Sequence, residues 1–180
     1  MRRIAFVAAL ALVAGPAFAQ SDYTHLDLEA CEVIATYEEA GGVDLKCPGY
    51  GGFPVYVSEG DARMDVDYGA PSGAFETFFA FNSVGETIEW FYDENGVYAA
   101  ALRFFIDVDG RSAEALVVSK VGLPGDPGCV VGVVDASVEQ ANGIARGIAA
   151  LSPLFDCPSD QVVIASGARE LVAGFGGANR

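Results

Sequence analysis

Alternating apolar and polar positions recur along most of the chain, separated by short turn-forming segments. A period of two is typical of strands that bury one face. The runs with β character are 31–37, 43–47, 53–57, 62–69, 87–93, 97–108, 113–121, 129–136 and 161–165. We therefore expect a mostly antiparallel β-meander in which neighbouring runs pair through short turns.

The run at 62–69 shows the alternation clearly. Met64, Val66 and Tyr68 are apolar, and Asp65 and Asp67 lie between them. Successive side chains of a strand point to opposite faces. We therefore expect the three apolar side chains in the core and both carboxylates on a solvated face.

The clearest turn signal is Asn95-Gly96, which lies between two β-rich runs. A two-residue type I′ turn needs positive φ at both positions, which asparagine and glycine accept. This turn would place Trp90 opposite Ala101, and a large side chain packs well beside a small one. The sequence therefore predicts a hairpin with that register.

One segment near the C-terminus has a helical period. Ser137 and Gln140 fit a capping box, so we expect the helix to begin at Ser137 and to end before Pro153. The apolar stripe consists of Val138, Ala141, Ile144, Ala145 and Ile148. We expect this stripe to pack on the sheet.

Residues 69–85 contain four phenylalanines, at positions 75, 78, 79 and 81. Neither a helical nor a strand period separates them. Such a cluster is most often part of a core, and this is the structure we expect. An exposed recognition patch is the alternative.

Together these elements predict an α+β fold. We expect a mostly antiparallel β-meander sheet of about seven to eight strands, with one C-terminal helix packed on it and disulfides as staples. Residues 20–180 have a suitable length for a single domain. The segment at about 168–180 is expected to be a flexible tail.

The first nineteen residues have the three parts of a secretory signal peptide. Arg2 and Arg3 form a basic start, residues 4–15 are apolar, and residues 17–19 fit the small-x-small cleavage pattern. The apolar part is too short to cross ~30 Å of hydrocarbon. We therefore expect cleavage after Ala19, no membrane span, and a periplasmic or secreted protein.

The chain is strongly acidic, with ten Lys and Arg against twenty-five Asp and Glu and a formal net charge of −15. Cleavage would remove two arginines and leave eight basic residues against twenty-five acidic ones, a net charge of −17. Such a charge repels nucleic acid and anionic membranes, and it attracts cationic proteins or metal ions. The expected partner is therefore a cationic protein, and no nucleic acid.

Four cysteines in an exported chain predict two disulfides. They are Cys31, Cys47, Cys129 and Cys157. Three pairings are possible, of which 31–47 with 129–157 needs only local closure. The spacings lack the closely paired cysteines of a zinc site, so we expect no metal and no cofactor.

Candidate catalytic groups are few. His25, the single histidine of the sequence, precedes the first predicted strand. The glycine-rich stretch at 47–52 lacks the lysine of a phosphate-binding loop, and G-x-S-x-G is absent. The neighbouring carboxylates are Asp65/Asp67, Asp93/Glu94 and Asp107/Asp109. Such pairs arise by chance in so acidic a chain, so we assign no catalytic residue; a small hydrolase using carboxylates or His25 is the alternative.

The stretch at 107–110, DVDG, is similar to part of an EF-hand loop. Alignment on Gly110 puts Phe105 at the first ligand position and Leu116 at the twelfth, where acidic residues are required. The motif therefore fails, and a plain β-turn explains the same residues. A looser calcium site, and hence a calcium-dependent binding module, is a further alternative.

Three motifs carry a resemblance: CPGYGGFPVYV…EGD from residue 47, FN..G.T.EW from residue 81, and DA…ANGIAR from residue 135. They resemble an uncharacterised family of small secreted bacterial proteins. The resemblance covers most of the chain after residue 19. It implies export and a single domain, but no activity, cofactor or site residue.

These observations favour a non-enzymatic binding or inhibitory module that docks onto a cationic protein in the cell envelope. The acidic charge, the disulfide staples and the lack of a catalytic motif support this expectation. The sequence does not indicate which residues bind, nor the oligomeric state.

Overall fold

The computed structural model describes residues 20–39 and 41–176, so the predicted signal peptide lies outside the described residues. The strands are β1 Gln20–His25, β2 Glu32–Tyr37, β3 Gly42–Cys47, β4 Val55–Gly60, β5 Arg63–Tyr68, β6 Phe81–Asp93, β7 Gly96–Val108, β8 Arg111–Lys120, β9 Cys129–Asp135 and β10 Val163–Ile164. The helices are α1 Ala141–Leu151 and α2 Glu170–Ala173, with 3-10 turns at Leu28–Ala30 and Ser152–Leu154. No helix in this part of the chain is long and apolar enough to cross a bilayer.

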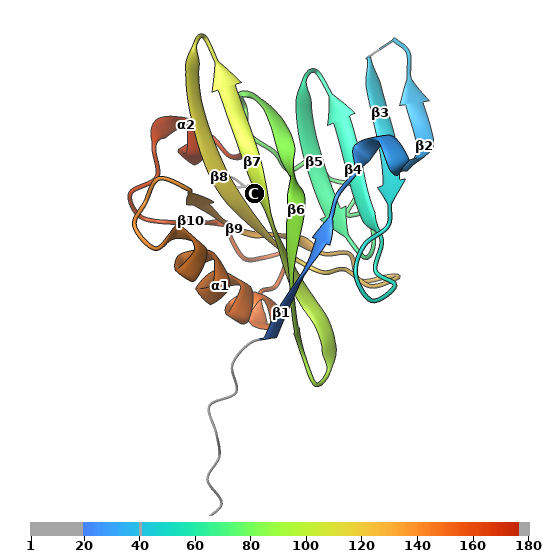
Figure 1. Ribbon diagram of the computed structural model, residues 1–180, viewed down its shortest axis with the longest axis vertical. Coiled ribbons are helices and arrows are strands. Elements are labelled where there is room, and N and C mark those ends of the chain that lie inside the picture. The colour runs from blue at the N-terminus through green and yellow to red at the C-terminus, as the bar shows by residue number, and fades with distance from the viewer. Residues whose placement is uncertain (1–19, 40, 177–180) are drawn as a thin grey trace, which may run out of the picture.

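The strands form two sheets, with the orders β1-β6-β7-β8-β9-β10 and β2-β3-β4-β5 (Figure 1). β9 and β10 pair in parallel, and the other neighbours are antiparallel. The mostly antiparallel α+β class is confirmed, but the single meander of seven to eight strands is wrong. After β5 the chain crosses to a second sheet, which begins with the edge strand β1, located before the first predicted β-run.

Apolar side chains pack on both faces of the six-stranded sheet. Trp90 and Phe104 face the four-stranded sheet, where they join Val55 and Val57 in the larger core. Phe91 faces the other way and joins a smaller core under α1. Each fully buried apolar side chain contributes roughly 1.5–3 kcal/mol relative to an exposed one.

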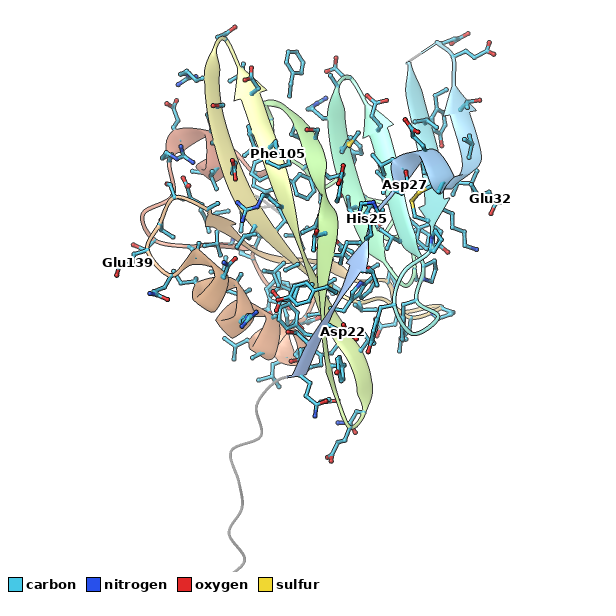
Figure 2. All side chains as sticks on the ribbon, in the orientation of Figure 1. Asp22, His25, Asp27, Glu32, Phe105 and Glu139 are labelled. Atoms are coloured by element: carbon cyan, nitrogen blue, oxygen red, sulfur yellow. A yellow bond between two sulfur atoms is a disulfide. The ribbon has the colours of Figure 1, made fainter. Side chains whose placement is uncertain are left out.

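The four-stranded sheet lies on the side of the molecule away from α1. Glu32, at the start of β2, and Glu139, just before α1, mark these two sides in Figure 2. The outer face of the four-stranded sheet is therefore not covered by α1.

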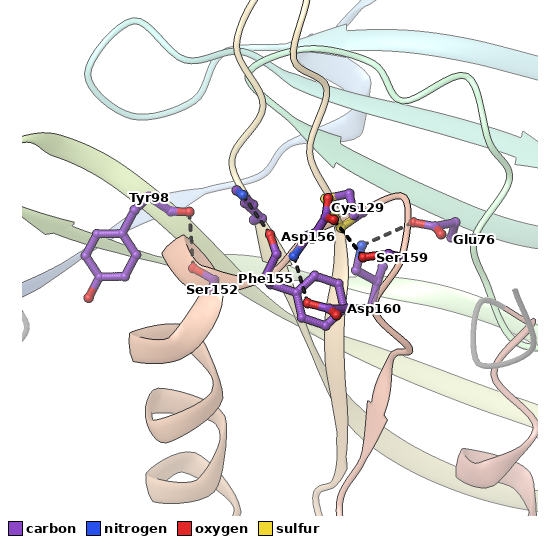
Figure 3. The surroundings of a disulfide bond; sticks show 11 residues. Glu76, Tyr98, Cys129, Ser152, Phe155, Asp156, Ser159 and Asp160 are labelled. Atoms are coloured by element: carbon purple, nitrogen blue, oxygen red, sulfur yellow. Dashed lines mark hydrogen bonds between the residues drawn. A yellow bond between two sulfur atoms is a disulfide. The ribbon is translucent and has the colours of Figure 1, made fainter.

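Both disulfides join neighbours in the fold. Cys31–Cys47 clamps the open end of the β2–β3 hairpin, with a Cα–Cα distance of 4.4 Å. Cys129–Cys157 ties the start of β9 to the segment after α1, with a Cα–Cα distance of 5.8 Å (Figure 3). Of the three possible pairings, the chain uses the local one.

A hairpin forms between β6 and β7, but its two-residue turn is Glu94-Asn95, one residue earlier than predicted, and Asn95 does not have positive φ. Asp93 pairs with Gly96, and after a register shift between Phe91 and Tyr92 the Trp90 residue lies opposite Ala100 instead of Ala101. The Asp93 Oδ1 atom accepts a hydrogen bond from the Asn95 backbone N–H at 2.7 Å, which fixes the turn one residue earlier. This is an Asx-type turn, in which the side chain competes with the backbone for the donor.

The helix begins at Ala141, four residues after the predicted start. Ser137 does not act as its cap, because both its N–H and its hydroxyl donate to the Asp135 carboxylate at 2.9 and 2.7 Å. Gln140 precedes the helix in a left-handed conformation, with φ of 61°. The stripe that includes Ala145 and Ile148 packs on the sheet as predicted.

The expected tail at 168–180 is packed as far as the structure describes it, to residue 176. Val172 and Phe175 are buried, and Phe175 forms an isolated bridge with Phe78. This part of the segment is therefore integrated into the fold.

Two expectations about exposure are also corrected. Asp65 is only 4% exposed. Residues 72–77 run beside its strand, where Ser72 N–H donates to Asp67 Oδ2 at 2.6 Å and the Thr77 hydroxyl donates to the Met64 carbonyl. In the phenylalanine cluster, position 78 is buried, whereas positions 75, 79 and 81 are 46%, 68% and 53% exposed. The core interpretation is therefore right for Phe78 alone.

Candidate functional site

The outer face of the four-stranded sheet follows from the alternation along β4. Val55 and Val57 are buried in the core between the sheets. Tyr56 and Ser58 lie between and after them, so their side chains point to the opposite, outer face. The sequence VYVS thus sets which face of the sheet is open.

The strand register places carboxylates beside these residues. Ser58 lies opposite Asp44 of β3 and Asp65 of β5, while Tyr56 lies opposite Asp67. Directly opposite residues on one face have Cβ atoms about 5 Å apart. Asp65 is covered, so Asp44 and Asp67 are the strand carboxylates that reach the open surface.

A hollow of about 550 Å³ lies over this face. β2 forms one wall, residues 71–75 form the other, and the β4–β5 turn closes one end. Its charged and aromatic side chains are Asp44, Asp61, Asp67, Arg63, Tyr37, Tyr56 and Phe75. Glu59 also borders the hollow, but the alternation along β4 puts its side chain on the face of Val57. We call this hollow the acidic groove.

The charges in the acidic groove are unbalanced: it contains the carboxylates of Asp44, Asp61 and Asp67 and one guanidinium. Arg63 pairs with Asp61, at 3.2 Å, at the closed end. The Tyr37 hydroxyl donates to Asp44 Oδ2 at 2.7 Å. This hydrogen bond and the negative charge of Asp44 raise the pKa of Tyr37, so the hydroxyl keeps its proton and holds the carboxylate in place.

Aromatic rings border these carboxylates. Phe75 and Tyr37 are 46% and 49% exposed, one on each wall. The Lys46 ammonium lies over the Tyr56 ring, 6.0 Å from its centroid, so this ring already contacts a cation within the chain. Carboxylates next to exposed rings are the surroundings that suit an ammonium or guanidinium group.

Two other hollows, of about 720 and 610 Å³, adjoin on the outer face of the six-stranded sheet and share Phe105 (Figure 2). Their basic residues are already paired with acids. The pairs are Arg169–Asp135, Arg103–Glu114 and Arg146–Glu89, at 2.7, 2.7 and 2.9 Å. Glu86 and Asp107 are further carboxylates in the linings of these two hollows.

The sequence-predicted catalytic candidates are scattered. His25 lies exposed at the end of β1, opposite Thr87 (Figure 2). The carboxylate pairs lie within β5, at the β6–β7 turn and at the β7–β8 turn, so they do not form one cluster. Within residues 20–39 and 41–176, no group of three or more His, Cys, Asp or Glu is placed to hold a metal ion.

The DVDG stretch at 107–110 forms the turn between β7 and β8. Asp109 and Gly110 have φ of 52° and 73°, as a two-residue hairpin turn requires. The β-turn interpretation of this stretch is confirmed.

Comparison of the chain with family models, curated proteins and solved structures finds no match. Sequence reasoning singled out Asp67, as a neighbour of Asp65, but not the other residues of the acidic groove, although the VYVS alternation identifies the outer face. It could not show that β2 and residues 71–75 form the two walls.

Proposed function

We propose that this protein is an exported, acidic binding module that docks a cationic segment of a partner protein in the acidic groove. The observation that carries the proposal is the groove itself, in which three carboxylates and the exposed rings of Tyr37 and Phe75 lie near a single arginine. The third ring, Tyr56, contacts Lys46. The net charge of −15 adds a field that attracts a cationic partner from a distance.

Each contact in such a groove contributes little. An exposed ion pair contributes roughly 0.2–1 kcal/mol, and an exposed cation–π contact contributes about 0.5–1 kcal/mol. Useful affinity therefore needs a partner segment with several basic side chains that engage the groove together. Binding of this kind weakens as salt screens the exposed charges.

The two disulfides support action in an oxidising compartment, the periplasm or the outside of the cell. They also hold β2, one wall of the groove, against β3. A rigid wall lowers the ordering cost of binding, which suits a binding or inhibitory module.

The test uses the oxidised protein and a fluorescent peptide of about nine residues, an ordinary strand length, in which lysine and threonine alternate. Asp44→Asn with Asp67→Asn removes two groove charges and keeps an oxygen for the bonds from Tyr37 and Ser72. We expect the affinity at low salt to fall roughly threefold to tenfold.

The matched control is Asp107→Asn with Asp109→Asn, which removes the same charge at the β7–β8 turn. We expect this variant to bind almost as tightly as the unmodified protein. Equal losses in both variants would mean that net charge, and not the groove, attracts the peptide. A peptide that fails to bind at low salt would contradict the proposal altogether.

A further inference from the structure

The edge strand β2, Glu32–Tyr37, borders the acidic groove and pairs with β3 on one side only. Val33, Ile34 and Tyr37 are 58%, 48% and 49% exposed. Its other edge therefore presents backbone N–H and C=O groups that another strand can pair with.

Proteins usually protect such an edge with lysine, proline, a bulge or a covering segment. Residues 32–39 contain no lysine, arginine or proline. A bulge between Val33 and Ala35 disturbs one end of the strand, but Ala35–Tyr37 keep a regular register with β3. By contrast, residues 69–80 cover β5 at the opposite edge of the sheet, as the Ser72–Asp67 hydrogen bond shows.

The charge near β2 selects the kind of strand that can pair. Glu32, Glu38 and Glu39 flank it, so a second copy of this chain would bring glutamates close to glutamates. Like charges on adjacent strands are destabilising. A strand that carries lysine or arginine is the complementary one.

The edge and the groove are also linked by geometry. Ala35 lies opposite Asp44, and Ile34 and Tyr37 line the groove. A strand added outside β2 would lie two strand spacings, about 10 Å, from β3. The small Ala35 side chain leaves an extended lysine or arginine room to reach over β2 to the Asp44 carboxylate.

We infer that the cationic partner binds by strand addition: an extended segment pairs with β2 and becomes a fifth strand of the sheet. Its basic residues occupy alternate positions, so that they share the outer face and project over the acidic groove. Main-chain hydrogen bonds provide affinity, and the alternate side chains provide specificity. This inference rests on the proposed function and adds the conformation of the partner.

Four peptides of equal charge and equal lysine and threonine content distinguish strand addition from charge attraction alone. The first alternates lysine and threonine over about nine residues, an ordinary strand length. The second has the same residues in a lysine block followed by a threonine block. The third and fourth are N-methylated forms of the alternating peptide. The third carries methyl groups at every second amide, which removes the hydrogen-bond donors of one strand edge. The fourth carries them on the other amides, which removes the donors of the opposite edge.

We expect the alternating peptide to bind at least roughly tenfold more tightly than the block peptide, and one of the two N-methylated peptides to lose at least as much. Hydrogen exchange should show the bound peptide protecting amides of β2 and leaving those of β1, the exposed edge of the other sheet, unchanged. The Asp44→Asn, Asp67→Asn variant should also bind the alternating peptide more weakly than the unmodified protein does.

The outcomes separate the two proposals. Suppose that all four peptides bind equally well and that the Asp44→Asn, Asp67→Asn variant still binds them more weakly. This result overturns strand addition and leaves docking in the groove intact. Protection of β1 instead of β2 also overturns strand addition. If none of the peptides binds at low salt, both proposals fail.

Discussion

Asp135 is a buried charge that the structure satisfies completely. Its side chain is 0% exposed and accepts hydrogen bonds from the N–H and hydroxyl of Ser137 and from the backbone and guanidinium of Arg169. Burial alone would raise the pKa of Asp135, but the hydrogen bonds from Arg169 and Ser137 outweigh it and hold that pKa below its usual range. The carboxylate thus ties the end of β9 to the segment that leads into α2.

Asp135→Asn should therefore destabilise the fold by about 2–4 kcal/mol, since it leaves Arg169 facing a neutral amide that can accept at one oxygen only. Urea unfolding at neutral pH measures this change. Glu114→Gln, which breaks the exposed pair with Arg103, is the control and should cost no more than about 1 kcal/mol. Equal effects of the two substitutions would contradict the assigned role of Asp135.

The pH dependence follows from the direction of the shift. A carboxyl whose pKa is lower in the folded state stabilises the fold above its unfolded pKa of about 3.9, and this stabilisation is lost as pH falls through the folded pKa. The difference in the free energy of unfolding between the unmodified protein and Asp135→Asn should thus be largest above about pH 4 and should narrow in more acidic solution.

Exposure of single residues was the hardest property to predict. Asp65 and Phe75 have the local patterns of an exposed acid and a core ring, and each has the opposite environment. The segment at residues 69–80 runs beside β5, where it bonds Asp67 and Met64, and it presents Phe75 to the groove. Its path depends on contacts with distant elements, such as the Phe78–Phe175 bridge, and no local period records them.

At the scale of elements, the sequence predicted most strands and both β2–β3 and β4–β5 hairpins, because alternation and turn residues are local signals. The errors lie at boundaries where a side chain competes for a backbone donor. Asp93 shifts the β6–β7 register, and Asp135 takes Ser137 away from the start of α1. Both competitors were visible in the sequence, two residues before the donors that they bind.

The disulfide at β2 should be important for binding as well as for stability. Replacing Cys31 and Cys47 with serine should lower the free energy of unfolding by about 3 kcal/mol, from the length of the closed loop. It should also weaken binding of the alternating peptide, because β2 loses its clamp to β3. Denaturant unfolding and fluorescence binding measure the two effects.

The control is Cys129→Ser with Cys157→Ser, which removes the staple near α1. Its stability loss should be of similar size, about 3.6 kcal/mol, because the closed loop is somewhat longer. Under conditions in which this variant is fully folded, its affinity for the alternating peptide should stay near that of the unmodified protein. Equal weakening in both variants would show that binding tracks overall stability and not the order of β2.

At the scale of the whole molecule, the two outer faces differ in their basic residues. The hollows on the six-stranded sheet contain three arginines, each paired with an acid, whereas the acidic groove on the four-stranded sheet contains one arginine. Composition predicts an acidic protein, but it does not show where on the surface the acidic side chains lie without basic neighbours. The split into two sheets decides the location, and it depends on the long crossing between β5 and β6.

The most direct test of this account is to map the alternating lysine–threonine peptide onto the isotope-labelled protein by two-dimensional NMR at low salt. The account predicts amide shift changes concentrated in β2, in β3 around Asp44, in β4 around Tyr56 and in residues 71–75, with their loss at high salt. Shift changes centred instead on Phe81, Phe105 and Arg169, or spread evenly over all acidic surfaces, would contradict it.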